Sequence, residues 1–356
     1  NLIINGAMQV AQRGTSSTTS GYGTVDRFTN THNGTDEAPT QAQVEVVSSD
    51  SGDNPFAKGF SNCMKITNGN QTSGAGAGDW VNIGYKPEAQ DIRNSGWNYN
   101  SSSSYITLSF YAKASVAQTY QVRLSSKDGT SQGFVFEYAL SANTWTKITK
   151  TIPGNSSLQF DNNNGNGMEM EFLMFIGTTY TSASPTLDAW GTYNYTTSRK
   201  DMTSTWYTTN DATFELTGVQ LEVGSVATDF EHRSFGQELA LCQRYYQKFV
   251  DAVTGANKIA IGCQYTSSQL YGFIRFLCEM RAAPTIDQGS ASGNNYAAFS
   301  AAYPNGVNFN SFNGFTGETT RGTGIYVNGV SGTAGQSVII DVINSAGGYI
   351  AASSEL

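Results

Sequence analysis

The sequence predicts an all-β chain: an N-terminal jelly-roll sandwich, a short connecting α-helix and a smaller C-terminal β-sandwich. Apolar and polar residues alternate over many short runs in both halves of the 356 residues, which is the period of a half-buried strand. Turn-forming residues separate these runs, and glycine alone occurs 38 times. One stretch has the spacing of an amphipathic helix instead. Together these observations indicate two β domains joined by a helix.

Residues 1–233 are predicted to form the jelly roll. The clearest strand covers residues 105–113, where Ile106, Leu108, Phe110 and Ala112 share one face. Residues 168–176 begin with alternation and end wholly apolar, as expected of a central strand buried on both faces. Further strands are predicted at 44–47, 120–124, 134–138, 145–148 and 214–223. The polar segments between some of these strands are predicted to be long loops, at 68–79, 153–167 and 178–211.

Residues 234–250 are predicted to form the connecting helix. Ser234 followed by Gln237 fits a capping box at its start. Apolar residues then recur at spacings of 3, 4 and 3, which would place them on one helix face: Leu239, Cys242, Tyr246 and Phe249. That face is expected either to pack on a neighbouring sheet or to form the seam of an oligomer.

Residues 251–356 return to the β pattern and predict the second, smaller sandwich. Runs at 258–263 and 271–277 flank a polar turn, as in a hairpin, and later runs predict strands at 324–327, 337–343 and 349–352. Aromatic residues crowd the polar stretch between them: Tyr296, Phe299, Tyr303, Phe309, Phe312 and Phe315. They are expected either to form an exposed tip that contacts a receptor or to fill the sandwich core.

Charge and apolar content exclude two classes of function. The chain has 20 basic and 28 acidic residues, a net charge of −8, which argues against a protein that binds nucleic acid. No stretch approaches 18 apolar residues, so no transmembrane helix is expected. The N-terminus lacks a basic region followed by an apolar core, so no signal peptide is expected.

The cysteines do not have the spacing of a metal site. None of Cys63, Cys242, Cys263 and Cys278 forms a CxxC pair, so buried free thiols are expected, with a Cys263–Cys278 bridge as the alternative. No cofactor is expected. A structural calcium ion stays open as an alternative, because oxygen ligands cluster at Asp50, Asp53 and Asn54.

Aromatic residues near the predicted loops are the candidate ligand contacts. Flat rings stack on the apolar faces of sugars, while amides and carboxylates bond the hydroxyl groups. The candidates in the first domain are Trp80, Tyr85, Trp97, Trp190, Tyr193 and Trp206. The alternative is that these rings cover the edge of the sandwich or a subunit interface.

Enzyme activity is not expected. His232 lies between acidic and basic neighbours, but no GxSxG elbow accompanies it, so a structural role is predicted. A depolymerase would need two facing carboxylates, and no spacing selects a pair among Asp188, Asp201, Asp211 and Glu215.

Three segments together resemble the tail-fibre and related virion proteins of tailed bacteriophages, especially marine and cyanobacterial ones. They are the opening run NLIINGAMQVAQRGT followed by DRF at 26–28, the run TGVQLEVGSVATDFEHR at 217–233, and ELALCQRYY at 238–246 with MRAAPT at 280–285.

The resemblance implies a carbohydrate-binding-module-like jelly roll, a short helix and a distal β domain. It also implies a homotrimeric fibre on the phage particle, made in the bacterial cytoplasm, that contacts other virion proteins and recognises a polysaccharide on the host surface. The alternative within the same family is a capsid-decorating or virion-stabilising protein without a ligand.

Overall fold

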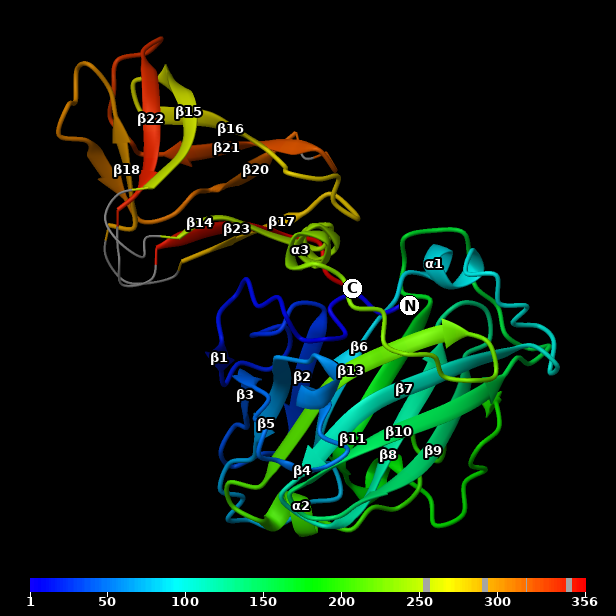
Figure 1. Cartoon of the computed structure of the whole chain (residues 1–356). Helices are drawn as coiled ribbons and strands as arrows, with labels where there is room; N and C mark the ends of the chain where they lie inside the picture. The colour runs from blue at the N-terminus through cyan, green and yellow to red at the C-terminus, as the bar shows by residue number, and fades with distance from the viewer. Residues whose placement is uncertain (252–256, 290–293, 318, 344–347) are drawn as a thin grey trace. The chain divides into compact units, whose positions relative to one another are not determined.

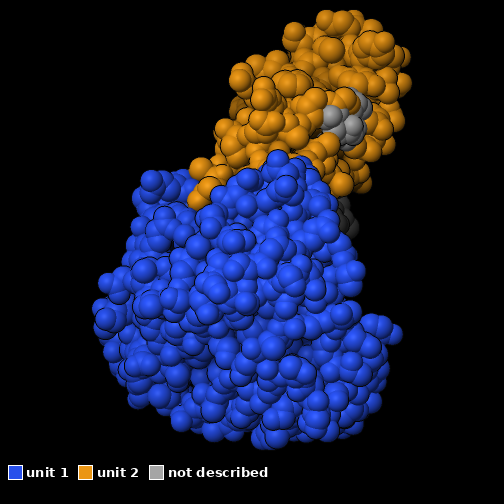
Figure 2. Space-filling model, turned by 90° about the vertical axis from the view of Figure 1, so that its right-hand side faces the viewer, with its two compact units in different colours: residues 1–238, 356 blue, residues 239–355 orange. Residues whose placement is uncertain are grey.

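The computed structural model describes residues 1–251, 257–289, 294–317, 319–343 and 348–356, which fold almost entirely as β-structure (Figure 1). The all-β prediction is therefore confirmed. The chain divides into two compact units, coloured separately in Figure 2: unit 1, residues 1–238 with Leu356, and unit 2, residues 239–355. Each unit has a hydrophobic core of its own.

Unit 1 is a jelly-roll-like sandwich of two sheets. One sheet has seven strands in the order β1 (Ser16–Ser17), β3 (Thr40–Glu45), β5 (Asn62–Thr67), β13 (Thr213–Val223), β7 (Tyr105–Ala114), β10 (Thr144–Pro153) and β4 (Ser51–Gly52). The other has six, in the order β12 (Gly191–Thr192), β9 (Gln132–Leu140), β8 (Gln118–Ser126), β11 (Met168–Ile176), β6 (Trp80–Tyr85) and β2 (Phe28–Asn33). Pairing is antiparallel except between β4 and β10.

The core of unit 1 lies between the two sheets. Phe110 of β7 packs edge-on against Phe172 of β11, with ring centroids 5.0 Å apart. The apolar face predicted for residues 105–113 therefore points into the core, as expected. The strand predicted at 168–176 matches β11 at both ends. Short helical turns complete the unit: η1 (Pro55–Lys58), α1 (Ala89–Arg93), η2 (Thr178–Tyr180) and α2 (Thr205–Thr208).

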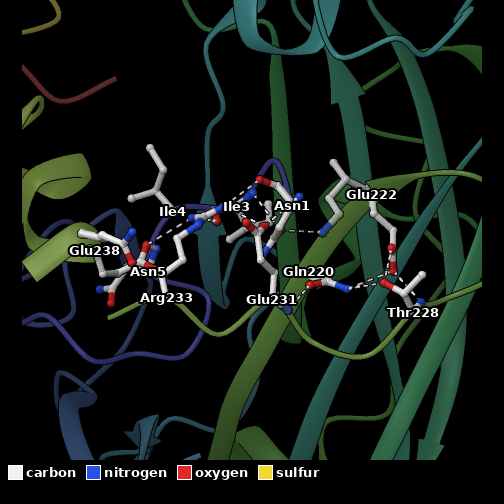
Figure 3. A network of polar contacts seen from close by, with 12 residues as sticks. Asn1, Ile3, Ile4, Asn5, Gln220, Glu222, Thr228, Glu231, Arg233 and Glu238 are labelled. Carbon is white, nitrogen blue, oxygen red and sulfur yellow. Dashed lines mark hydrogen bonds and ion pairs between the residues drawn. The ribbon is translucent and has the colours of Figure 1, made fainter. Parts of the chain in front are cut away.

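The opening segment and the 217–233 segment, which carry much of the family resemblance, bond to one another. Asn1 Oδ1 accepts hydrogen bonds from the backbone N–H groups of Ile3 and Leu221 at 3.0 and 3.2 Å. Arg233 donates to the carbonyl oxygens of Asn1 and Ile3, and Figure 3 shows how these side chains and the Glu222–Thr228 contact form one network. The network anchors the segment that follows β13.

Asn5 is the polar centre of the opening segment. It is fully buried and has a left-handed backbone (φ 61°). Its side-chain amide donates to the carbonyl oxygens of Val10 and Asp26, and its side-chain oxygen accepts from the Val10 N–H, each at 2.9 Å. Three buried backbone groups therefore depend on one side chain.

Asn5→Ala is expected to lower the free energy of unfolding of unit 1 by about 2–4 kcal/mol. The change leaves these three backbone groups unpaired, and it forces alanine into a left-handed backbone conformation. Tryptophan fluorescence during urea unfolding measures this, since all five tryptophans lie in unit 1. Asn33→Ala, which removes one exposed bond to the Gly78 carbonyl, is the matched control and should change stability by under about 0.5 kcal/mol. Equal effects of the two changes would contradict the prediction.

The predicted connecting helix is correct at its start and wrong at its end. Ser234 Oγ accepts a hydrogen bond from the Gln237 N–H, and Gln237 Oε1 accepts one from the Ser234 N–H, so the capping box is confirmed. The helix, α3 (Phe235–Gln243), stops seven residues before the predicted boundary, and β14 (Tyr246–Asp251) follows. The predicted division at 233 and 250 is replaced by a boundary within α3.

The predicted helix face does not exist. Leu239 and Cys242 lie on α3, whereas Tyr246 and Phe249 lie on β14. The Tyr246 hydroxyl is buried within unit 2 and bonds to the Asp287 carboxylate at 3.0 Å, and Phe249 stacks on Phe276 at 5.8 Å. These four residues therefore do not form a single helical seam.

Unit 2 is the smaller sandwich that the sequence predicts. Its three-stranded sheet has the order β14, β23 (Tyr349–Ser353) and β17 (Thr285–Gln288). Its seven-stranded sheet has the order β19 (Val307–Phe309), β18 (Tyr296–Phe299), β22 (Ser337–Val342), β15 (Asn257–Thr266), β16 (Gln269–Arg275), β21 (Gly322–Asn328) and β20 (Gly314–Thr316). The core lies between them.

Three of the aromatic residues at 296–315 fill this core. Tyr296, Phe309 and Phe312 are buried and pack on one another, with ring centroids 4.8–5.4 Å apart. The exposed-tip interpretation is therefore wrong for these three. Tyr303 is exposed, Phe299 is half-buried, and the side chain of Phe315 lies outside the described residues.

Candidate functional site

Three of the predicted ligand contacts are core residues. Tyr85, Trp97 and Trp206 are 1%, 3% and 0% exposed. The Trp97 and Trp206 indoles donate to the carbonyl oxygens of Ser104 and Thr213, and the Tyr85 hydroxyl accepts from the Ile4 N–H. Because a buried ring has no free face for a sugar, the ligand role predicted for these three is wrong.

The other three predicted contacts do not converge on one site. Trp190 is 9% exposed and its indole donates to the Pro153 carbonyl. The half-buried Tyr193 ring lies under the guanidinium of Arg123, at 4.9 Å, so that face is occupied. Trp80 is half-buried and packs edge-on against Tyr180. A ligand contact at Trp80 stays a prediction.

The structure instead forms a cleft of 680 Å³ on the outer face of the seven-stranded sheet of unit 1. Its floor comes from β7, β10 and the bulge of β13. The rest of the lining comes from β4, η1 and the residues around them, and from the segment after β13, whose Phe230 and His232 rings contact Phe60. The lining residues are Gly52, Asp53, Asn54, Ala57, Lys58, Phe60, Ser109, Tyr111, Lys147, Gly218, Thr228, Asp229, Phe230 and His232.

Four rings make the cleft aromatic. Phe60 lies at their centre, with its centroid 5.5 Å from that of Tyr111, 4.8 Å from Phe230 and 4.9 Å from His232. Phe60 and Tyr111 are buried, whereas Phe230 is half-buried and His232 is exposed. His232 Nε2 lies 2.9 Å from the Lys58 carbonyl oxygen, which requires Nε2 to carry a proton. Phe230 is thus the ring best placed to meet a ligand.

Charged groups of both signs surround these rings. Lys147 Nζ lies 5.8 Å from the centre of the Tyr111 ring, and the Lys147 backbone N–H donates to Asp53 Oδ2 at 3.0 Å. Burial raises the pKa of the Tyr111 hydroxyl, and the nearby Asp53 and Asp229 carboxylates raise it further. The phenol therefore stays protonated and can donate as well as accept a hydrogen bond.

A partly buried ionic cluster supports the floor. Lys113 Nζ lies 2.6 Å from Asp50 Oδ2 and 2.8 Å from Glu215 Oε2, and the Trp145 indole donates to the same Asp50 oxygen at 3.0 Å. Burial alone would lower the pKa of Lys113, but Asp50 and Glu215 more than offset this and raise it. Lys113 stays charged, and it joins β7 and β13 to the loop that leads into β4.

The predicted calcium ligands have other roles. Asp50 is paired with Lys113, Asp53 accepts from Lys147, and Asn54 Oδ1 accepts from the Phe56 N–H at the start of η1. Within the described ranges, no group of three or more His, Cys, Asp or Glu side chains could hold a metal ion. The four cysteines are free thiols, so the Cys263–Cys278 bridge is not formed. Cys63 and Cys242 are buried as predicted, whereas Cys263 is exposed and Cys278 is half-buried. No helix in the described part of the chain is long and apolar enough to span a membrane.

Gly218 shapes the floor of the cleft. It lies in a β-bulge of β13 opposite β7, with φ +63°. A Cβ atom at this position would lie 2.8 Å from Tyr111 Cδ2 and 2.9 Å from Phe60 Cζ. Only glycine therefore lets the two rings lie against the bulged backbone.

Sequence reasoning missed the rings of this cleft, although signals for them were present. Tyr111 is a large aromatic on the outward face of a strand whose inward face holds Leu108 and Phe110. Gly218, Phe230 and His232 all belong to the 217–233 segment of the family resemblance. The contribution of Phe60 depends on contacts with residues far along the chain, Tyr111 and Phe230, which local patterns do not reveal.

Comparisons with known proteins add no family assignment. No family model matches the chain, and no curated protein matches it. Among solved structures, the enzymatically active domain of tailspike protein 4 of bacteriophage CBA120 is 12% identical, with a TM-score of 0.34 over 63% of this chain and 21% of that one. The match thus spans about a fifth of the length of that tailspike domain.

Two sugar-related structures have similar scores. A putative sugar binding protein from Bacteroides thetaiotaomicron is 13% identical, with a TM-score of 0.33 over 63% of this chain and 100% of that one. The N-terminal cellulose-binding domain of Cellulomonas fimi β-1,4-glucanase C is 11% identical, with a TM-score of 0.28 over 62% of this chain and 99% of that one. Scores this low carry no argument about ligand or activity.

Proposed function

We propose that the chain is a phage virion protein that recognises a glycan on the host surface and binds it in the cleft around Phe60, Tyr111 and Phe230. The observation that carries the proposal is the combination of clustered rings and charged groups in one open cleft. The virion location rests on the three resembling segments alone. The proposed part of the virion is the tail fibre, and the proposed assembly of the chain is a homotrimer.

The chemistry of the cleft fits a sugar better than a purely apolar or ionic ligand. The half-buried Phe230 ring can stack on the C–H face of a pyranose. Around it, the Tyr111 hydroxyl, Asp53, Asp229 and Lys147 provide donors and acceptors for ring hydroxyls. Both signs of charge are present, so the cleft does not select a polyanion or a polycation.

The proposed activity is binding without cleavage. A glycosidase needs a protonated acid and a second carboxylate on opposite sides of the scissile bond. The four carboxylates considered from the sequence lie outside the lining of the cleft: Asp188, Asp201, Asp211 and Glu215. Of the two carboxylates that do line it, Asp53 and Asp229, Asp53 already accepts a hydrogen bond from the Lys147 backbone N–H. Glu215 pairs with Lys113 and Asp188 with Lys150.

A printed array of bacterial capsular and lipopolysaccharide-derived glycans, followed by calorimetric titration of the best-binding oligosaccharide, tests the proposal. Phe230→Ala is expected to weaken binding about five- to tenfold, since loss of one stacked ring costs about 1–1.5 kcal/mol. Lys147→Ala is expected to weaken binding by several-fold, while its backbone bond to Asp53 is kept.

Tyr195→Ala is the matched control, because this ring is 62% exposed on unit 1 and does not line the cleft. It should bind like the wild type. Tryptophan fluorescence verifies that each variant of unit 1 is folded. A chain that binds no arrayed glycan, or a folded Phe230→Ala variant that binds with unchanged affinity, would refute the assignment.

A further inference from the structure

A second, smaller cavity of 340 Å³, here called the side cavity, lies next to the cleft of unit 1. It is lined by Ala7, Gln9, residues 59–62 and Phe235. Phe60 lines both the side cavity and the cleft, and Ala7 and Phe60 belong to the same hydrophobic cluster as Tyr111 of the cleft floor. The two cavities therefore share one base.

The rings of Phe60 and His232 form the junction between the two cavities. Gly59 lines the side cavity, and a Cβ atom at this glycine would lie 3.6 Å from Cε1 and Nε2 of His232, which lines the cleft. The centroids of the His232 and Phe60 rings are 4.9 Å apart. A ligand that leaves the cleft across these two rings enters the side cavity.

His232 presents a polar group at this junction. Its Nε2–H donates to the Lys58 carbonyl oxygen, which holds the exposed ring in one orientation. In the neutral ring, Nδ1 is then a hydrogen-bond acceptor. A sugar hydroxyl at the junction can donate to it.

The lining of the side cavity is polar but uncharged. Gln9 and Asn62 contribute amides and Ser61 contributes a hydroxyl, and within the described residues these three side chains are free of hydrogen bonds to protein groups. The cleft, in contrast, is lined by two aspartates and two lysines. Amides and hydroxyls bond sugar hydroxyl groups without selecting a charge, so the side cavity fits an uncharged sugar residue.

Phe235 supplies the flat apolar surface that a sugar also needs. Its side chain is 57% exposed although it lines the cavity, so the ring is open to stacking on the C–H face of a pyranose. The backbone on both sides of the ring is fixed by the Ser234–Gln237 capping box and by the bonds of Arg233 to the opening segment (Figure 3). Because the ring is held in place before a ligand arrives, stacking on it costs little ordering.

We infer that the side cavity is a second sugar-binding subsite, which takes an uncharged residue of the same glycan chain that stacks on Phe230 in the cleft. The inference rests on the proposed function and narrows its ligand class. The ligand is a glycan chain long enough to cross the Phe60–His232 junction, with an uncharged residue next to the part bound in the cleft. A single sugar fills one cavity and leaves the other open.

Calorimetric titration with glycan fragments of increasing length tests the inference. The probe is a ladder of oligosaccharides, from single sugars upward, made by partial acid hydrolysis of the bacterial polysaccharide that binds best on the array. The affinity of the wild type is expected to rise about five- to tenfold at the length that first fills both cavities, as one more ring is stacked. Phe235→Ala should remove this rise and leave the binding of shorter fragments unchanged, whereas Phe230→Ala should weaken the binding of every fragment.

Phe56→Ala is the matched control, because Phe56 on η1 is 52% exposed and lines neither cavity. It should keep the wild-type dependence on length. Phe235→Ala is expected to fold, since alanine favours the helix and both capping residues are kept. Gln9→Ala is a second variant of the side cavity and should weaken the binding of the longer fragments alone, by several-fold.

Failure of this inference is distinguishable from failure of the proposed function. If the fragments bind through Phe230, but folded Phe235→Ala and Gln9→Ala variants have the wild-type affinity at every length, the side cavity is not a subsite and the cleft acts alone. If no fragment binds, or if folded Phe230→Ala binds all of them like the wild type, the proposed function fails and the inference fails with it.

Discussion

Glu171→Gln is expected to lower the free energy of unfolding of unit 1 by about 3–5 kcal/mol. Glu171 lies on β11 and pairs with two arginines: its oxygens lie 2.5 Å from Nη2 of Arg123 and 2.9 Å from Nη2 of Arg199. The Arg123 side chain is 1% exposed, so its charge cannot be solvated if its partner is neutralised. Glu169, 3.0 Å from Arg123, compensates only in part.

The same pair makes unit 1 sensitive to acid. Burial alone would raise the pKa of Glu171, but Arg123 and Arg199 reverse the effect and hold it at about 2, against an ordinary value of 4.5. A depressed pKa stabilises the folded state above the unfolded pKa, and this stability is lost as the pH falls from about 4.5 to about 2. A shift of this size corresponds to about 3 kcal/mol.

Urea unfolding followed by tryptophan fluorescence at pH 7, 4 and 3 measures both effects. The difference between the wild type and Glu171→Gln should be largest at pH 7 and should shrink as the pH falls. Glu137→Gln is the matched control: Glu137 pairs with Lys200 at 3.0 Å on the same sheet, but the Lys200 side chain is 41% exposed, so about 1 kcal/mol or less is expected. A difference that does not change with pH would show that lost packing, not lost charge, is responsible.

Gly218→Ala is expected to destabilise unit 1 by about 3 kcal/mol and to abolish ligand binding in the cleft. About 1–2 kcal/mol comes from forcing alanine to φ +63°, and a further 1–3 kcal/mol from the added methyl group, which displaces the Tyr111 and Phe60 rings. Because these rings form the floor of the cleft, the loss of binding should exceed that of Phe230→Ala.

Gly74→Ala separates the two contributions. Gly74 also has a left-handed backbone (φ +77°), but a Cβ atom there would meet nothing within 4 Å. Gly74→Ala should therefore lower the free energy of unfolding only by the backbone strain, about 1 kcal/mol, and leave ligand binding unchanged. Equal losses of stability in the two variants would show that the rings at Gly218 move aside freely.

The sequence by itself determined the fold class, because alternation of period 2 depends on nearby residues. The run at 105–113 predicted both a strand and its buried face, and β11 was predicted to its ends. The start of α3 was predictable for the same reason, since the Ser234–Gln237 capping box is a local contact.

Tertiary contacts alone decided where α3 ends and where the ligand cleft lies. The spacing of three between Tyr246 and Phe249 suits a helix face, but pairing of β14 with β23, about 100 residues later, selects a strand with an irregularity in register between Lys248 and Val250. The cleft likewise joins Phe60, Tyr111 and Phe230 from three distant segments. Trp97 and Trp206 were predicted as ligand contacts because polar neighbours surround them in sequence, but folding puts them in the core. Whether an aromatic ring is buried or faces a ligand depends on what packs over it, which the local sequence does not specify.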